Sequence, residues 1–144
     1  MKNNIKGKVA IVGIAETKVG KHPGKTSDQL AAEASIKAIE DAGLNKDDID
    51  GVLTPGSFEG AYSTQSAHSA IFAEYMQIHP RFTAMMRLGG ATPAAMVEHA
   101  ALAINAGLCN TVLIAAGDNR ISGISRQKTM EIMSSVGHPE FEDP

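Results

Sequence analysis

Short apolar runs rich in β-branched residues alternate along this chain with longer stretches of mixed polarity. Two of these runs, residues 9–15 and 111–116, are apolar at successive positions and therefore on both faces, which is typical of strands buried between two layers of helices. The runs at 51–54 and 82–88 are interpreted as two further strands. The pattern thus predicts a sheet whose strands are separated by intervening segments.

The stretches between these runs carry helix signals. Thr26 followed by Gln29 forms a capping-box pattern, in which each residue's side chain bonds the other's backbone. A helix from 26 to about 42 is therefore expected, with Gly43 as its left-handed cap. A second helix is expected over 66–77.

Residues 94–106 form the most informative stretch, because almost all of them are apolar. Thr92 is expected to be the N-cap of a helix there, with Pro93 at the first helical position, where its missing N–H costs nothing. A helix that is apolar nearly all round is buried nearly all round. We therefore expect this helix to lie between apolar layers, which a plain two-layer domain would not provide.

The predicted elements follow the order β-α-β-α-β-α-β, without an internal repeat or an obvious linker. Such alternation predicts the α/β class, with a mixed or parallel sheet and right-handed crossovers. A chain of 144 residues fits one domain with a sizeable core.

Composition and charge narrow the classes of function. The net charge is −3, and the lysines and arginines form no stripe, so no nucleic-acid partner is expected. No apolar run approaches the length of a membrane span. A single cysteine excludes an internal disulfide framework and fits a reducing compartment. The sequence therefore indicates a cytoplasmic protein without a membrane partner.

Familiar chemical motifs occur only in broken form. Residues 20–26 resemble a phosphate-binding loop, but the loop is one residue short, and we interpret it as a surface turn. Residues 46–51 resemble a calcium-binding loop without its first carboxylate and are interpreted as a solvated turn. The five histidines show no metal-ligand spacing, so no metal site is expected. Cys109 is interpreted as a buried structural thiol.

The segment from Leu88 to Pro93 is the strongest candidate for a site. A strand turns through Gly89 and Gly90 directly into the N-terminus of the apolar helix. Free N–H groups and partial positive charge at such a terminus suit an anion or a developing oxyanion. The alternative is that the glycines only permit a tight turn, and the local sequence favours neither reading.

Taken together, these segments resemble the thiolase superfamily, and in particular the thiolases of the sterol-carrier-protein type. The resemblance covers nearly the whole chain and rests on the stretches 9–17, 38–44, 49–52, 89–92, 106–117 and 138–142. It implies a layered αβαβα fold built from two similar halves and usually dimeric, with this chain as the N-terminal half. It also implies coenzyme A thioesters as ligands and a cysteine thiolate at the strand-to-helix junction that takes up an acyl group.

Two departures from the family pattern bear on function. The family's nucleophilic cysteine aligns with Gly90, or else with Gly89 or Ala91, none of which has a nucleophilic side chain. The chain also stops at Pro144, before the second half that would supply the catalytic histidine and a second cysteine. We therefore expect residues 1–144 to be a truncated N-terminal thiolase domain that is not catalytic alone.

The resemblance leaves three functions open. The principal expectation is a thiolase-like acyltransferase homologue, related to acetyl-CoA acetyltransferases and acting on coenzyme A thioesters. The second is a carbon–carbon lyase that cleaves a β-hydroxyacyl-CoA by retro-aldol chemistry, works with a zinc-ribbon/OB-fold partner and needs no acyl-enzyme. The third is a non-catalytic pseudo-thiolase subunit. The missing cysteine shifts the expected chemistry toward the second and third.

The expected site is the same for all three. Gly89, Gly90, Ala91 and Thr92 are expected to bind the substrate, with no catalytic side chain in this chain, no metal, and no cofactor besides the acyl-CoA substrate itself. The resemblance further implies a homodimer, or a heteromer with the missing second half or with a zinc-ribbon/OB-fold subunit.

Overall fold

The computed structural model describes residues 5–56 and 67–134. Its elements follow one another as α1 (Ser27–Asp41), η1 (Lys46–Asp48), β1 (Gly51–Thr54), α2 (His68–Tyr75), β2 (Phe82–Met85), η2 (Gly89–Ala91), α3 (Thr92–Asn105), β3 (Val112–Ile114), α4 (Arg120–Gly123) and α5 (Arg126–Ser134). Within these residues the sheet has three parallel strands in the order β2-β1-β3. Val52 of β1 is paired with Thr83 of β2 on one side and with Leu113 of β3 on the other.

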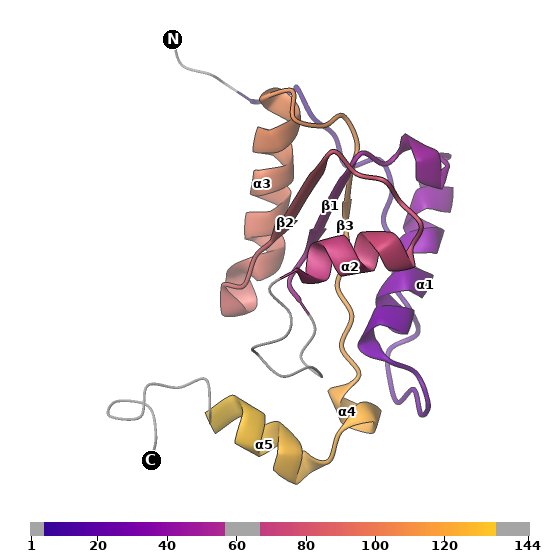
Figure 1. Ribbon diagram of the computed structural model, residues 1–144, viewed down its shortest axis with the longest axis vertical. Helices are drawn as coiled ribbons and strands as arrows, with labels where there is room; N and C mark the ends of the chain where they lie inside the picture. The colour runs from indigo at the N-terminus through magenta and orange to yellow at the C-terminus, as the bar shows by residue number, and fades with distance from the viewer. Residues whose placement is uncertain (1–4, 57–66, 135–144) are drawn as a thin grey trace.

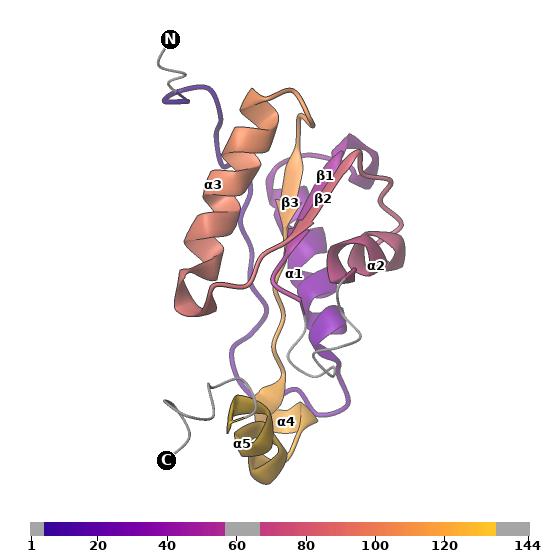
Figure 2. The ribbon, with the colours of Figure 1, turned by 60° about the vertical axis from the view of Figure 1, so that its left-hand side comes forward.

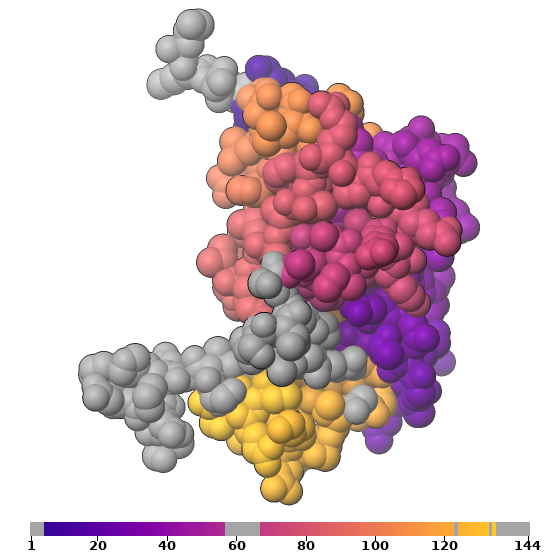
Figure 3. Space-filling model, viewed as in Figure 1, coloured from indigo at the N-terminus to yellow at the C-terminus, as the bar shows by residue number. Residues whose placement is uncertain are grey.

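Helices cover both faces of this sheet. α1 and α2 lie on one face and α3 lies on the other (Figures 1 and 2). From outside, α2 and the chain that follows it fill the middle of one face of the molecule, between α1 and α3 (Figure 3). The main core cluster joins the sheet to α1 and α2 through Ala31, Ala32, Ile39, Val52, Phe72, Ala73, Leu113 and Ala115. The α/β class predicted from the sequence is confirmed.

The local signals at the ends of α1 are confirmed. The backbone N–H of Gln29 donates to Oγ1 of Thr26 at 3.1 Å, and the N–H of Thr26 donates to Oε1 of Gln29 at 2.9 Å. Gly43 has a φ of +67°, the left-handed conformation that glycine adopts without steric cost. Both ends of the helix are therefore determined by residues next to it in sequence.

Asp50 connects the starts of β1 and β3. Its carboxylate accepts backbone N–H groups from Asn110 at 2.7 Å and Thr111 at 2.8 Å, and the side-chain amide of Asn110 at 3.0 Å. Burial alone would raise the pKa of Asp50, but these hydrogen bonds and the charge of Arg81 outweigh it, so the pKa lies below its ordinary value. Asp50 therefore aligns two strands whose residues are far apart in the sequence.

The first expected strand, residues 9–15, is not a strand here. The segment is extended but pairs with no strand of the described chain. Its large side chains are exposed, with Ile11 at 72% and Ile14 at 75% of their full accessible area. The prediction of double burial was wrong for the chain as described, because no described strand lies against this segment.

The expected all-round burial of the helix over 94–106 is met on one face only. Met96, Ala100 and Ala103 of α3 are buried against the sheet, whereas Val97 is 43% and Leu102 46% exposed. Val97 borders a cavity beside residues 9–15, and among the described residues no element covers the outer face that carries Leu102. The sequence pattern therefore indicates a second covering layer that these residues do not provide.

Other boundaries differ in detail. The strands expected over 82–88 and 111–116 are shorter, and α4 and α5 were not predicted. Residue 66, the first of the helix expected over 66–77, lies outside the described residues. The whole stretch 138–142 lies outside them as well. None of the described helices is both long enough and apolar enough to span a bilayer.

Replacing Asp50 by Asn should lower the free energy of unfolding by about 1–2 kcal/mol at neutral pH, because charge-assisted hydrogen bonds are stronger than neutral ones. The folded pKa of Asp50 is depressed, so its contribution is fully present above the unfolded value of about 3.9 and is lost as the pH falls through the folded value. Urea denaturation of both proteins across this pH range measures the difference. A gap that persists unchanged at the acid end would contradict this account.

Candidate functional site

The junction between β2 and α3 is built by backbone geometry. β2 ends at Met85, and after three intervening residues the chain enters the 3-10 turn η2, which leads directly into α3. Gly89 opens this turn with a φ of +59°, which favours glycine. Oγ1 of Thr92 accepts the N–H of Leu88 at 2.8 Å and donates to the carbonyl oxygen of Gly89 at 2.7 Å. The turn is therefore held in place by Thr92.

The expected role of Thr92 as N-cap was wrong. Thr92 is itself helical, Ala91 occupies the N-cap position, and no described side chain caps the first turn of α3. The hydroxyl of Thr92 is engaged in the preceding turn, and the residue is only 6% exposed. The N–H groups of Ala91 and Thr92 donate to the carbonyl oxygens of Leu88 and Gly89 within this turn, and Pro93 has no N–H. The helix therefore contributes mainly the partial positive charge of its N-terminus.

The three residues before Thr92 are accessible. Gly89, Gly90 and Ala91 are all exposed, and they stand at the positive end of a helix of 14 residues. The four predicted substrate-binding residues thus lie together in one turn, three of them open to solvent and the fourth buried beneath it. Such an arrangement can bind an anion or stabilise an oxyanion through backbone groups.

The junction has no thiol. A Cβ placed on Gly90 would meet no atom within 4 Å, so the position is open but empty of any reactive group. The sole cysteine, Cys109, follows the opposite end of α3, about 20 Å away along the helix axis. It is 1% exposed, and burial together with the charge of Asp50 raises its pKa. Cys109 is a structural thiol, as predicted, and not a displaced nucleophile.

A polar relay that the sequence did not reveal lies at the carboxyl end of β1. Nδ1 of His68 is 2.8 Å from Oγ1 of Thr54, and its Nε2 is 2.9 Å from Oδ1 of Asp28. Thr54 is 1% and His68 6% exposed, so neither can reach a substrate in this arrangement. The relay joins β1 to the starts of α1 and α2. It thereby stabilises the carboxyl end of the sheet, where the junction lies.

Arg87 brings a positive charge to the same carboxyl end of the sheet. A Cβ placed on Gly56, just beyond β1, would be 3.3 Å from Nη2 of Arg87, which places the guanidinium over the end of that strand. Arg87 also precedes the junction by one residue, Leu88. Its position in the β2–α3 connection is a signal that the sequence offered, since an arginine next to a glycine-rich turn suits an anionic ligand.

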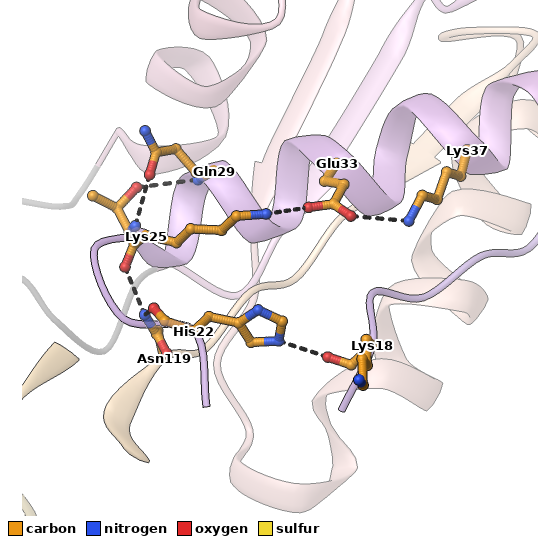
Figure 4. Close-up of polar contacts among 8 residues, drawn as sticks. Lys18, His22, Lys25, Gln29, Glu33, Lys37 and Asn119 are labelled. Atoms are coloured by element: carbon orange, nitrogen blue, oxygen red, sulfur yellow. Dashed lines mark hydrogen bonds and ion pairs between the residues drawn. The ribbon is translucent and has the colours of Figure 1, made fainter. Parts of the chain in front are cut away.

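A second polar cluster lies where α1 begins (Figure 4). The side-chain amide of Asn119 donates to the carbonyl oxygens of His22 at 2.9 Å and Lys25 at 2.6 Å. Glu33 pairs with Lys25 at 2.7 Å and Lys37 at 2.9 Å. Hydrogen bonds from these two lysines lower the pKa of Glu33 to about 2. These contacts order the loop before α1, which the sequence predicted to be a surface turn.

The cluster borders a cavity of about 710 Å³ that is lined by residues 15–20, by His22 and by the chain from Ala116 to Ile121 after β3. Across residues 5–56 and 67–134, no three histidine, cysteine or acidic side chains are grouped closely enough to hold a metal ion.

Comparisons with known proteins find relatives that are named as a lyase, an aldolase and an acetyl-CoA acetyltransferase. No protein-family model matches the chain. A 17-hydroxy-3-oxo-4-pregnene-20-carboxyl-CoA lyase of Mycobacterium tuberculosis is 34% identical over 120 residues, which are 83% of this chain and 30% of the relative. A steroid side-chain-cleaving aldolase of Thermomonospora curvata is 32% identical over 118 residues, covering 82% of this chain and 29% of the relative. An acetyl-CoA acetyltransferase of Methanocaldococcus jannaschii is 27% identical over 106 residues, or 74% of this chain and 27% of the relative.

The fold has a solved counterpart. The Ltp2-ChsH2(DUF35) aldolase superposes with a TM-score of 0.69 and 28% identity, over 94% of this chain and 34% of that one. These likenesses support the resemblance to the thiolase-like superfamily, whereas none of these relatives is named as a sterol-carrier-type thiolase. The chain spans about 30% of the length of the two lyase relatives.

The open position at Gly90 predicts the behaviour of an introduced thiol. In a Gly90→Cys variant the new side chain should react with iodoacetamide, with a pKa below the ordinary value of about 8.5 because it stands at a helix N-terminus. Alkylation rates measured against pH would report this pKa, while the buried Cys109 stays unmodified in the parent chain.

Glu98→Cys provides the matched control, since Glu98 is exposed in the middle of the same helix. Its thiol should titrate near the ordinary value. If both introduced thiols titrate alike, the positive end of α3 does not act on position 90.

Proposed function

We propose, from the likeness to a lyase, an aldolase and a solved aldolase structure, that this chain is part of a thiolase-like carbon–carbon lyase that cleaves a β-hydroxyacyl-CoA by a retro-aldol reaction. By the complete protein we mean this chain together with the polypeptide that supplies the remaining length of its relatives. The activity belongs to the complete protein.

The observation that carries this proposal is a strand-to-helix junction with backbone donors and no nucleophile. Acyl transfer through an acyl-enzyme needs a side-chain nucleophile, and Gly89, Gly90 and Ala91 offer none. A retro-aldol cleavage needs a base and an oxyanion site. The comparisons support the same reading, because the relatives that are 34% and 32% identical are a lyase and an aldolase, whereas the acetyltransferase reported above is 27% identical.

The reaction balances without an enzyme-bound intermediate. A base removes the proton from the β-hydroxyl group, and the oxygen forms the carbonyl of the released aldehyde or ketone. The bond between Cα and Cβ breaks, and its electron pair moves into the thioester as an enolate. A proton added at Cα then yields the shortened acyl-CoA. The enolate oxygen carries the developing negative charge, which is the charge that a helix N-terminus stabilises.

The described residues have distinct parts in this proposal. The backbone around Gly90 faces the thioester oxygen, and Thr92 positions that backbone through its two hydrogen bonds. Arg87 adds positive charge for the enolate or for a phosphate of coenzyme A. The base comes from the polypeptide beyond this chain.

A partner subunit is part of the same proposal. The solved structural counterpart is named as a pair, Ltp2 with a DUF35 protein, ChsH2. We infer that the complete protein works as a heteromer with a zinc-ribbon/OB-fold subunit of this kind. The outer face of α3, on which Leu102 is 46% exposed, is available for a covering layer.

The decisive assay incubates the complete protein and a DUF35-type partner with a β-hydroxyacyl-CoA. The expected products are a free aldehyde or ketone and a shortened acyl-CoA in equal amounts, detected by mass spectrometry. A parallel sample with radiolabelled acyl-CoA should show no label on the denatured protein. Covalent label on the chain, with no carbonyl compound released, would establish the acyltransferase instead.

Gly89→Ala should lower kcat in this assay by about tenfold or more, because a side chain at a positive φ distorts the turn that aims the backbone donors. Gly107→Ala is the matched control. Gly107 has a φ of +75°, compared with +59° at Gly89, a Cβ added at either position would have no atom within 4 Å, and Gly107 lies past the far end of α3.

Both substitutions should lower the free energy of unfolding by about 1–2 kcal/mol. Only Gly89→Ala should lower kcat. Equal loss of kcat in the two variants would show that the turn has no part in the chemistry beyond its stability.

A further inference from the structure

His68 is a buried histidine whose two ring nitrogens contact elements that are far apart in the sequence. Nδ1 lies 2.8 Å from Oγ1 of Thr54 at the end of β1, and Nε2 lies 2.9 Å from Oδ1 of Asp28 in the first turn of α1. The ring stacks on Phe72 of its own helix, with centroids 6.2 Å apart and planes at 12°. His68 is 6% and Phe72 1% exposed. The ring is therefore held in one orientation by three contacts.

The hydrogen bonds of this relay run in one direction. A carboxylate only accepts hydrogen bonds, so the hydrogen between Nε2 of His68 and Asp28 belongs to the ring. In a neutral imidazole the other nitrogen is then an acceptor, and the hydroxyl of Thr54 donates to it. Thr54 is 1% exposed, and a buried hydroxyl without an acceptor is costly. The orientation of the Thr54 side chain therefore depends on His68.

Thr54 also holds the chain that leads to the junction. It is the last residue of β1, and its carbonyl oxygen accepts the N–H of Met86 at 3.1 Å. Two residues further along, the N–H of Leu88 donates to Oγ1 of Thr92 at 2.8 Å. A continuous series of hydrogen bonds and short backbone steps thus connects His68 with the start of α3.

We propose that His68 is a positioning residue for the lyase reaction. By accepting the hydroxyl of Thr54, it fixes the place where the chain leaves β2, and with it the place of the positive end of α3 relative to the thioester. The inference rests on the function proposed above, because it assigns His68 to that reaction. A link that only attached α1 and α2 to the sheet would affect the free energy of unfolding, whereas a positioning residue also affects kcat of the folded protein.

His68→Ala separates these two roles in the complete protein with its partner. It should lower kcat by about tenfold or more and change KM by less than about twofold, because a small displacement of the turn weakens stabilisation of the transition state more than binding of the substrate. Asp50→Asn is the matched control. It weakens the hydrogen bonds that precede the opposite end of β1, and it should lower the free energy of unfolding without lowering kcat. An unchanged kcat in folded His68→Ala would overturn the proposal.

Two conservative variants test whether the effect passes through Thr54, and they serve as well where His68→Ala does not fold. In His68→Asn the amide oxygen takes the place of Nδ1, since both atoms are bonded to Cγ, and it can accept the hydroxyl of Thr54. In His68→Gln the amide lies farther out and reaches toward Asp28 instead. His68→Asn should therefore retain most of kcat and His68→Gln should not. Equal losses, or the opposite order, would overturn the proposal.

The thiol of Gly90→Cys gives a readout that does not depend on the reaction. Adding Thr54→Val to this variant of the chain removes the hydroxyl with little change in shape. It should move the thiol pKa toward the ordinary value of about 8.5, because the thiol is then less well placed at the helix N-terminus. Adding Asp50→Asn should leave the thiol pKa unchanged.

The two readouts distinguish failure of the reaction from failure of the positioning role. If the complete protein releases no carbonyl compound but Thr54→Val still shifts the thiol pKa, the proposed reaction is wrong, and with it the assignment of His68 to that reaction. If carbonyl release is intact and neither kcat nor the thiol pKa responds to these substitutions, only the positioning role is wrong.

Discussion

The complete burial of β1 is the constraint on which the rest of the structure depends. Val52 and Leu53 have no exposed surface, which requires a strand on each side and helices on both faces. A shift of β1 would open its contacts with both neighbouring strands and with the helices on both faces. The position of its carboxyl end is therefore well defined. The N–H of Met86 donates to the carbonyl oxygen of Thr54 at 3.1 Å, so the chain that leaves β2 toward Gly89 starts from that point. The position of the junction thus follows from core packing rather than from any ligand.

Signals confined to a few neighbouring residues predicted local structure well. The pair Thr26 and Gln29 specified the start of α1, and Gly43 its end, because a cap involves only groups within one helical turn. The relay among Thr54, His68 and Asp28 could not be predicted, since its members lie 14 and 40 residues apart and periodicity carries no information about such partners. The candidate turn at 89–92 was found from its glycines, but the buried role of Thr92 depends on a backbone geometry that the sequence does not state.

The two incorrect burial predictions have one physical origin. Residues 9–15 and α3 are both apolar on faces that the described chain leaves open, with Val12 at 62% and Leu102 at 46% exposure. An apolar pattern indicates that a segment requires apolar surroundings. The pattern is the same whether the covering atoms belong to the same chain or to another polypeptide. Exposed apolar surface on this scale marks interaction sites in soluble proteins. The mismatch between pattern and structure therefore locates two apolar surfaces of the kind that contact other polypeptide segments.

The absence of a thiol at the junction leaves its electrostatics intact. The donors around Gly90 are backbone groups, and their arrangement depends on the positive φ of Gly89 and on the hydroxyl of Thr92, not on a side chain at position 90. A turn of this kind stabilises an oxyanion equally well on an acyl-enzyme or on an enolate. The residue at position 90 decides only whether a covalent route is open. With glycine at position 90, the junction of this chain supplies no side chain for an acyl-enzyme, and its remaining features agree with the carbon–carbon cleavage proposed above.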